Sequence, residues 1–519
     1  MPGTGLAKPS QQQVAEPFDD DSVEPGVWRY ARASRVRVIV DAADYFDLMQ
    51  QAMLKARQRV LLIGWDVDTR IHLTRGRRWW QKGSSRQYPS RLGSFIPWLT
   101  RHNRDLEIRI LKWSLGALQF LTRGTMALDL LRWAPHRRID FKFDTVHPIG
   151  CSHHQKIAVI DRSLAVCGGI DMTDRRWDTP EHREQDRRRR SPGGGLHGPW
   201  HDVTMMLEGE VAGALDDLGR DRWTRAGGKP LRRVPDAGPT AWPDGLEPDL
   251  EEVEVGIART RAEHNGSPAV TEIEALFLRQ IARARRFIYA ENQYFASRVV
   301  AEAISRRLVE DDPPEIVIVN PQTADGWVET KAMDPARARL MHAIRELDRH
   351  GRFHLYTPFT GETPIYVHAK LLIVDDEVLR VGSANFNNRS LGLDSECDVF
   401  IDCARPANRH CGPAIRALRL RLLGEHCGLS PQEVAERIER TGSMAAMIAE
   451  LGTDRTHSLR RFDPGEAGEV EGGLAELEVL DPEEPAEMFV FRRPGRGLFR
   501  RGSLLARAMN RARGKGARR

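Results

Sequence analysis

The chain has 519 residues and a net charge of +5, with 40% apolar and 29% charged residues, a composition typical of soluble globular proteins. Its apolar runs, such as residues 60–65, are the length of a strand and far short of the roughly 18–20 residues that cross a bilayer. The six cysteines form no CxxC pair, and the N-terminus lacks the features of a secretory signal. These observations exclude a disulfide-rich or membrane-spanning protein and predict a cytoplasmic one of two domains.

The first half of the chain contains a helix that leads directly into a strand. Residues 1–30 are predicted to be a disordered lead-in to an N-terminal lobe over 31–230. Within this lobe, residues 43–56 have helical apolar spacing, and the run that follows to residue 65 has the pattern of a buried strand. A stretch rich in proline and glycine over 231–260 predicts a linker.

The second half repeats this organisation. The stretch "TEIEALFLRQIARARRFIYAENQYF" again places a helix before a strand, within a predicted C-terminal lobe over 261–425. Strand-like runs such as "EIRILKWS" and "EIVIVNP" alternate with helical runs in both halves. The fold class is therefore predicted to be α/β, with two similar lobes whose sheets are flanked by helices.

Three segments are predicted after the second lobe: a helical extension over 426–460, a flexible acidic linker over 461–491 and a basic tail over 492–519. The tail holds eleven Lys and Arg residues and no acidic residue, which leaves 67 of the 78 basic residues against all 73 acidic ones in the rest of the chain. Apolar residues are interspersed among the tail arginines: Leu498, Phe499, Leu504, Leu505, Ala508 and Met509. Such a segment predicts contact with anionic lipid at a membrane surface.

One motif occurs in both halves with the same spacing. Each copy reads His-x-Lys, then four residues, then Asp; the residues are His154, Lys156 and Asp161 in the first copy and His368, Lys370 and Asp375 in the second. Each copy continues with glycine fourteen residues after the histidine and with Asp171 or Asn385 at plus seventeen. The chain has ten lysines, and His-x-Lys occurs only at these two places. The duplication makes a chance origin implausible.

The spacing predicts a hairpin in each copy. Alternate residues of a strand share a face, so the histidine and lysine of one copy point the same way. A turn near Arg162 would bring Asp171 level with His154, and a turn near residue 376 would bring Asn385 level with the second histidine. The two motif acids, Asp161 and Asp375, would lie at the far turns, where they suit a structural role.

Phosphoryl transfer is the chemistry that needs such a set. Two lysines and an amide can neutralise and hydrogen-bond the phosphate oxygens, while one neutral histidine attacks phosphorus and forms a phosphohistidine. The other histidine can protonate the leaving oxygen, a step worth roughly 10²–10⁴-fold in rate. This mechanism requires no metal and no cofactor, and no carboxylate cluster that would hold a metal is recognisable.

The paired motifs resemble the phospholipase D superfamily, and their details are similar to eukaryotic-type phospholipase D proper. The resemblance covers roughly residues 35–425 and is carried by "HHQKIAVIDRSLAVCGGIDMTDRRWD", "PWHDVTMMLEGEVA", "ENQYF" and "IYVHAKLLIVDDEVLRVGSANFNNRSLGLDSE". It implies a duplicated fold with the active site between the lobes. It also implies hydrolysis of phosphatidylcholine or phosphatidylethanolamine to phosphatidic acid, with transfer to alcohols.

The resemblance also implies roles for individual residues. The catalytic set would be His154, Lys156, His368, Lys370, Asn385 and Glu396, with Asp171 and Ser383 as substrate-binding residues. His154 is predicted to be the nucleophile and His368 the general acid and base. Glu396 matches the acid that orients the second histidine, and either Asp178 or Asp202 could orient the first.

Three other functions use related features. A cardiolipin synthase-like phosphatidyltransferase would use the same pocket but usually carries N-terminal membrane helices. A nucleic-acid phosphodiesterase would need a basic groove, whereas the chain without its tail is acidic, so no nucleic-acid partner is expected. A silent membrane-binding protein would not need both motifs intact. We therefore expect a monomeric, cytoplasmic enzyme that acts on membrane phospholipids, peripherally at the inner membrane surface.

Overall fold

The computed structural model describes residues 24–74, 88–113, 124–235, 240–463, 481–485 and 497–516, with the backbone alone for 327–332 and 512–516. The predicted α/β architecture is confirmed. The strands of the first lobe are β1 (Arg29–Val40), β2 (Arg59–Gly64), β3 (Glu107–Trp113), β4 (Ile139–Asp144), β5 (Ile157–Ile160), β6 (Leu164–Gly168), β7 (Trp200–His201) and β8 (Val203–Glu208). Its helices are α1 (Ala42–Lys55), α2 (Leu92–His102), α4 (Gly124–Trp133) and α5 (Glu210–Arg225).

The second lobe repeats this order of elements. Its strands are β9 (Leu250–Arg261), β10 (Val270–Thr271), β11 (Phe287–Asn292), β12 (Glu315–Val319), β13 (Phe353–Thr360), β14 (Thr363–Pro364), β15 (Tyr366–Val367), β16 (Lys370–Val374), β17 (Val378–Gly382) and β18 (Glu396–Asp402). Its helices are α6 (Glu272–Arg283), α7 (Arg298–Leu308), α8 (Trp327–Leu347) and α9 (Gly412–Cys427), with short turns η1 (Arg389–Leu393) and η2 (Pro406–Asn408).

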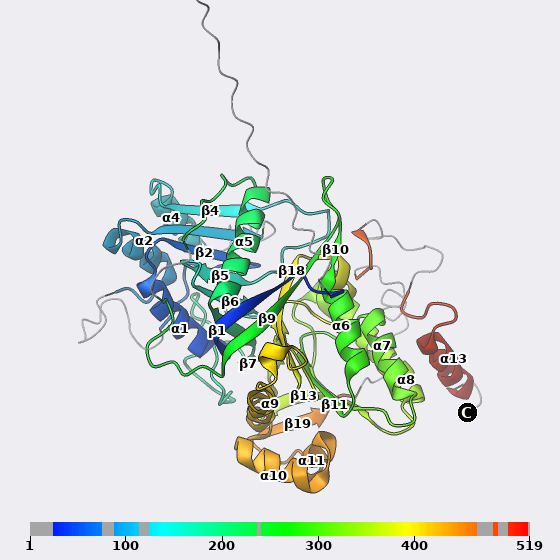
Figure 1. Ribbon diagram of the computed structural model, residues 1–519. Coiled ribbons are helices and arrows are strands. Elements are labelled where there is room, and N and C mark those ends of the chain that lie inside the picture. The colour runs from blue at the N-terminus through cyan, green and yellow to red at the C-terminus, as the bar shows by residue number, and fades with distance from the viewer. Residues whose placement is uncertain are drawn as a thin grey trace, which may run out of the picture.

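The strand pairing shows that the lobes are copies of one another. The first sheet runs β4-β3-β2-β5-β6-β8-β1, and the second runs β13-β12-β11-β16-β17-β18-β9. The two sheets join where β1 pairs antiparallel with β9, and these strands lie side by side between the lobes in Figure 1. In both sheets, parallel strands linked by helices are followed by antiparallel hairpins, so the motif hairpins β5–β6 and β16–β17 occupy equivalent places.

The prediction of a linker over 231–260 is wrong for its last part, because strand β9 begins at Leu250. The second lobe therefore begins earlier than residue 261. The segment 250–260 follows a stretch rich in proline and glycine and begins with several glutamates, which favoured the linker interpretation. It is a strand because Val253, Val255 and Ile257 alternate along it and are buried in the core, and because it pairs with β1. On the exposed face, Arg32 of β1 forms an ion pair with Glu252.

The segment after α9 is only partly the predicted helical extension. Helices α10 (Pro431–Thr441) and α11 (Met444–Leu451) are followed by strand β19 (His457–Arg461), which pairs antiparallel with β13 and extends the second sheet. Helix α10 begins with a capping box between Ser430 and Glu433, as its sequence favours.

The basic tail contains helix α13 (Leu504–Gly516), which lies beside α8 in Figure 1. Leu498, Leu505 and Ala508 are buried with residues of α7 and α8 in the core of the second lobe. These apolar residues of the tail therefore pack within the protein, and contact of the tail with anionic lipid stays a prediction. Residues 492–496 and 517–519 of the tail, and most of the predicted acidic linker, lie outside the described residues.

Part of that predicted linker is instead packed on the second lobe. The Asp481 carboxylate accepts hydrogen bonds from the backbone amides of Asn388 and Arg389, at 3.1 and 2.8 Å. Among the helices of the described residues, none has the length and apolar character needed to cross a membrane.

Candidate active site

Each histidine and lysine pair lies at the start of a buried hairpin. The backbone of Lys156 accepts a hydrogen bond from Gly168 (3.4 Å), which continues the β5–β6 register and brings Asp171 back toward the start of the motif. Lys370 opens β16, which pairs with β17. Both predicted hairpins are present, and in the first one Asp171 Oδ2 lies 3.2 Å from Lys156 Nζ.

The two motif acids hold the far ends of these hairpins. Asp161 accepts the backbone amides of residues 57, 58 and 59, and Asp375 accepts those of residues 285, 286 and 287, all within 2.5–2.8 Å. Both acids have positive φ, 50° and 57°, a conformation that aspartate tolerates better than most residues. The structural role that the sequence predicts for Asp161 and Asp375 is therefore what their contacts show.

Short backbone pairings join each histidine segment to the other lobe. His153 forms a parallel bridge with Ser395, and the amide of His154 donates to the carbonyl of Ser395 at 2.9 Å. In the same way, β15 pairs with β7, and the amide of His368 donates to the carbonyl of His201 at 2.8 Å. The residue after Ser395 is Glu396, and the residue after His201 is Asp202. Each motif histidine therefore lies beside an acid of the other lobe.

These pairings bring an acid of one lobe to the histidine of the other. His154 Nδ1 lies 3.0 Å from both carboxylate oxygens of Glu396, and His368 Nδ1 lies 2.7 Å from Asp202 Oδ2. This corrects the expectation that Glu396 orients the second histidine: it orients the first, and Asp202 orients the second. Glu396 and Asp202 occupy equivalent positions at the start of equivalent strands. Because the lobes are related by a twofold axis, each acid contacts the histidine of the opposite lobe.

Asp178, the other candidate for orienting His154, lies elsewhere. Its carboxylate contacts His182 Nδ1 at 3.0 Å, the amide of Trp200 at 2.9 Å and the guanidinium of Arg189 at 3.2 Å.

Glu396 is fully buried and is held by hydroxyl groups. Ser383 and Ser390 donate to its two oxygens, the latter at 2.7 Å. Burial raises the pKa of Glu396, whereas the Ser383 hydroxyl and the charge of Lys156 oppose that rise. Ser383 thus supports the orienting acid, and its direct contact with substrate stays a prediction, as does that of Asp171.

The two lysines have different partners. Lys156 is paired with Asp171, which also accepts the backbone amide of Trp65 at 3.1 Å. Lys370 Nζ donates to the neutral amide oxygen of Gln293 at 3.0 Å. Burial, together with the charge of Lys156, lowers the pKa of Lys370 to about 7. The Asn385 side chain is buried beside Gln293, and its Oδ1 makes no hydrogen bond among the described residues.

Positive charge and burial keep both histidines neutral in the free protein. Burial and then the charges of Lys156 and Lys370 lower the pKa of His154 well below 6.5. Burial and the charges of Lys370, Arg176 and Lys156 do the same for His368. Residues of both motifs therefore share one electrostatic environment, as a single site between the lobes requires.

A glycine makes this close approach possible. A Cβ atom on Gly169 would lie 2.1 Å from Asp202 Oδ1 and 3.3 Å from the carbonyl oxygen of His368. The first motif therefore touches the second at a point where only glycine fits.

Sequence reasoning missed several neighbours of the site. Trp200 stacks on Tyr366 with ring centroids 4.4 Å apart and lies 5.3 Å from the ring of His368. The guanidinium of Arg176 lies 4.2 Å above Trp200. Gln293 and Trp200 belong to "ENQYF" and "PWHD", stretches that carry the family resemblance but no repeated spacing.

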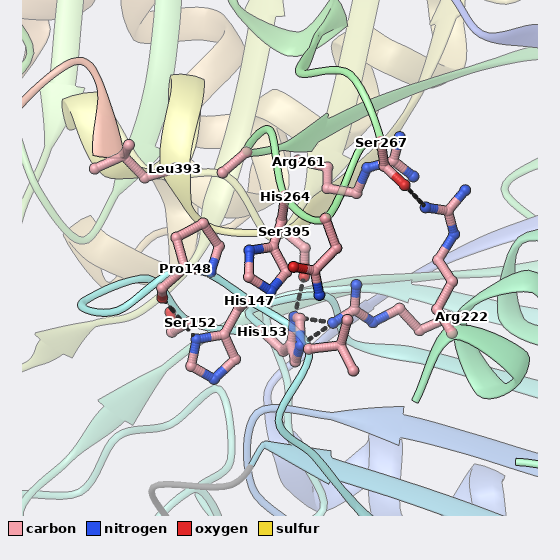
Figure 2. A pocket seen from close by; sticks show the side chains of 14 residues that line it. His147, Pro148, Ser152, His153, Arg222, Arg261, His264, Ser267, Leu393 and Ser395 are labelled. Carbon is pink, nitrogen blue, oxygen red and sulfur yellow. Dashed lines mark hydrogen bonds between the residues drawn. The ribbon is translucent and has the colours of Figure 1, made fainter. Parts of the chain in front are cut away.

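A cavity of about 260 Å³ lies beside the first motif (Figure 2). It is lined by His147, His153, Arg222, Arg261 and His264, among others, and Figure 2 shows His153 between Ser395 and Arg222. Because successive residues of an extended chain point to opposite sides, His153 faces this cavity while His154 faces Glu396. The lining residues include neither motif histidine nor motif lysine.

Comparisons with known proteins agree with this geometry. The family model described as "Phospholipase D" matches residues 119–301 and 359–473, which is more than half of the chain. A second, described as "Cardiolipin synthase, PLD-like domain", matches residues 277–411.

Curated relatives include phospholipase D alpha 1 of Carica papaya, 24% identical over 74% of this chain and 63% of the relative, and that of Nicotiana tabacum, 25% identical over 81% and 68%. Phospholipase D A of Dictyostelium discoideum is 25% identical over 76% of this chain and 36% of its own. The chain thus spans about 63% of the papaya relative and about a third of the Dictyostelium one.

Among solved structures, phosphatidylserine synthase of Haemophilus influenzae matches 81% of this chain and 96% of its own, with a TM-score of 0.49 and 10% identity. Polyphosphate kinase of Porphyromonas gingivalis matches 75% and 50%, with a TM-score of 0.41 and 10% identity. The family model matches both motifs, and the structure sets the two motif histidines against acids at the junction of two like lobes; the chain therefore belongs to the phospholipase D family.

Proposed function

We propose that this protein is a phospholipase D that hydrolyses glycerophospholipids to phosphatidic acid and the free headgroup, with transfer to alcohols as a second outcome. The observation that carries the proposal is the crossed pair of histidine–carboxylate contacts, His154 with Glu396 and His368 with Asp202. In both pairs Nδ1 is engaged by an acid, which leaves Nε2 for chemistry.

The first step forms a covalent intermediate on His154. Its side chain is 15% exposed against 6% for His368, and its lowered pKa favours the neutral imidazole. The Nε2 lone pair attacks phosphorus, the bond from phosphorus to the headgroup oxygen breaks, and protonated His368 gives its proton to that oxygen. Lys156 and Lys370 would stabilise the phosphate oxygens as charge develops.

The second step releases phosphatidic acid. His368, now neutral, takes a proton from water, whose oxygen attacks phosphorus and breaks the bond to His154 Nε2. An alcohol in place of water gives a phosphatidyl alcohol by the same path. The phosphodiester adds negative charge between the two lysines, which favours the protonated form of His368 while substrate is bound.

Glycerophospholipid as the substrate is supported by the names of the plant and Dictyostelium relatives, all called phospholipase D. The direct test is incubation of the purified protein with mixed vesicles of phosphatidylcholine and phosphatidylethanolamine in the presence of ethanol. We expect phosphatidic acid and phosphatidylethanol by mass spectrometry, and the loss of both in the His154→Ala and His368→Ala variants. His136→Ala, at an exposed histidine outside the site, is the matched control.

Near wild-type turnover in either motif variant would eliminate the two-histidine mechanism. A second candidate, phosphatidyl transfer to a lipid alcohol, is favoured by the match of the second lobe to the cardiolipin synthase model. Supplying phosphatidylglycerol in the same assay separates the two, because a transferase would give cardiolipin in preference to phosphatidic acid.

A further inference from the structure

A second group of buried polar residues lies behind the catalytic histidines and takes no part in the proposed reaction. It consists of Asp41, which precedes α1, His182 and His201 of the segment that follows the first motif, and Glu425 of α9. Their side chains are 0–6% exposed. Three come from the first lobe and one from the second, so the group lies across the junction between the lobes.

The distances within the group match those of a tetrahedral metal site. His182 Nε2 lies 3.4 Å from Asp41 Oδ2 and 3.1 Å from Glu425 Oε1. His201 Nδ1 lies 3.5 Å from Asp41 Oδ1 and 2.7 Å from Glu425 Oε1. Ligands at Zn–N and Zn–O bond lengths in a tetrahedron are about 3.3–3.4 Å from one another, so a cation at the centre would be within bonding distance of each residue after small adjustments.

Each histidine is held by a carboxylate on its other ring nitrogen. His182 Nδ1 contacts Asp178 Oδ2 at 3.0 Å, and His201 Nε2 contacts Glu291 Oε2 at 2.7 Å. Such partners fix the tautomer and the ring orientation of metal-binding histidines. The outer carboxylates are themselves held, Asp178 by Arg189 and Glu291 by Tyr289 and His426.

Two of the four residues have strained backbone, and two ligand atoms lack a hydrogen bond. Asp41 and His182 have φ of 65° and 35°, a conformation that costs free energy for a residue with a side chain and that gathers at functional sites. Asp41 Oδ2 and His201 Nδ1 are buried and make no hydrogen bond of normal geometry among the described residues. Both atoms belong to the proposed ligand set.

The charge of the group would also accommodate a divalent cation. Asp41, Asp178, Glu291 and Glu425 are four carboxylates in one buried network. Among the described contacts, Arg189 supplies one compensating guanidinium. Buried carboxylates without a counter-charge are costly, and a divalent cation would offset two of the remaining charges.

From these observations we propose that Asp41, His182 Nε2, His201 Nδ1 and Glu425 bind a divalent transition-metal ion of the Zn²⁺ class. Two nitrogen and two oxygen ligands from the protein close the coordination shell, so the site is structural. This group was not recognisable in the sequence, because its members are far apart in the chain.

The site would support catalysis through its neighbours. The Asp41 amide donates to the Asp202 carbonyl at 2.8 Å, and the Asp202 amide donates to Asp41 Oδ1 at 3.2 Å. His201 immediately precedes Asp202 and accepts the amide of His368. The ion would therefore fix the segment that holds the orienting acid behind His368, and join Glu425 of the second lobe to the first.

The test is metal analysis of the purified full-length chain by mass spectrometry after growth with added Zn²⁺. We expect about one Zn²⁺ per chain, and less than a fifth of that in His182→Gln and in Glu425→Gln. His136→Gln, at an exposed histidine outside the group, is the control, and this variant should still bind about one Zn²⁺. In the metal-depleted wild type, Zn²⁺ but not Mg²⁺ should raise Tm.

Replacement by Co²⁺ gives a readout that does not depend on activity. Tetrahedral Co²⁺ has intense visible absorption bands, which we expect in the wild type and in His136→Gln and not in His182→Gln. A wild-type chain that holds no ion and takes up neither Zn²⁺ nor Co²⁺ would overturn the proposal, because protons on the histidines would then supply the missing charge. Retention of a full equivalent of Zn²⁺ by both ligand variants would overturn it as well.

Discussion

At the residue scale, His154 and His368 have the same contact with an acid but different surroundings. His154 is the more exposed of the two, with its acid held by two serine hydroxyls. His368 lies against the ring of Trp200 and beside the charge of Arg176. The access of His154 suits a nucleophile, and the enclosed position of His368 suits a group that passes a proton to and from a bound oxygen.

The crossed pairing predicts different responses of the two orienting acids to the leaving group. In Glu396→Gln the nucleophile loses its partner, so the burst of product from an aryl phosphodiester should fall by roughly 10³–10⁴-fold. In Asp202→Asn only the acid is impaired, and an aryl leaving group needs no proton, so the burst should survive. Rapid-quench kinetics with p-nitrophenyl phosphocholine would measure both. If the burst survived in Glu396→Gln and was lost in Asp202→Asn, Glu396 would instead orient the second histidine.

Lys370 predicts how anion binding changes with pH. Burial lowers its pKa to about 7, so in the free protein it is charged below that pH and neutral above it. Affinity for dimethyl phosphate, which stays a monoanion throughout, should therefore rise as pH falls from about 8.5 to about 6, by roughly tenfold per pH unit at most. Calorimetry would measure this. Lys370→Met should bind weakly with no such dependence, and a wild-type affinity that is flat across this range would contradict the assignment.

Individual residues differed in how well the sequence revealed them. Duplicated spacing was enough to identify His154, Lys156, His368 and Lys370, because alternation in a strand is a local property. The partner of each histidine was not local: it depends on the bridge between His153 and Ser395, a tertiary contact that no spacing within one lobe encodes.

At the scale of elements, the hairpins depend on their motif acids. Asp375 accepts three backbone amides of the segment that enters β11, so Asp375→Ala leaves buried donors without a partner and should cost about 2–4 kcal/mol of unfolding free energy. Asp161→Ala should behave alike. Urea denaturation would measure the loss, with Glu377→Ala, at a neighbouring exposed side chain, as the control. If Asp375→Ala instead abolished turnover at unchanged stability, the acid would belong to the chemistry.

Elements with local patterns were predicted well, and those that depend on partners were not. The helix-then-strand repeat gave α1–β2 and α6–β11 correctly because apolar periodicity sets them. Strand β9 was taken for a linker because it follows a stretch rich in proline and glycine, although Val253, Val255 and Ile257 alternate along it. Strand β19 was missed because it lies at the edge of the second sheet and pairs with β13, which is distant in the sequence.

At the scale of the whole molecule, the tail belongs to the second lobe. Because Leu505 is fully buried against the core of that lobe, Leu505→Asp should lower the free energy of unfolding by about 2–5 kcal/mol. Reversing the exposed charges with Arg501→Glu, Arg507→Glu and Arg511→Glu should leave stability unchanged but weaken binding to anionic vesicles at least about tenfold. Denaturation and vesicle sedimentation would measure the two effects, and unchanged sedimentation would exclude the tail as the lipid contact.

In the proposed reaction, two histidines from separate lobes meet across one phosphorus atom. The most direct measurement is a crystal structure with vanadate, which adopts the five-coordinate geometry of phosphoryl transfer. We predict a single vanadium atom bonded to His154 Nε2, with His368 Nε2 within hydrogen-bonding distance of the oxygen on the opposite side and both lysines on the equatorial oxygens. Vanadate held by one motif alone, with the other imidazole facing a separate cavity, would exclude the two-histidine reaction.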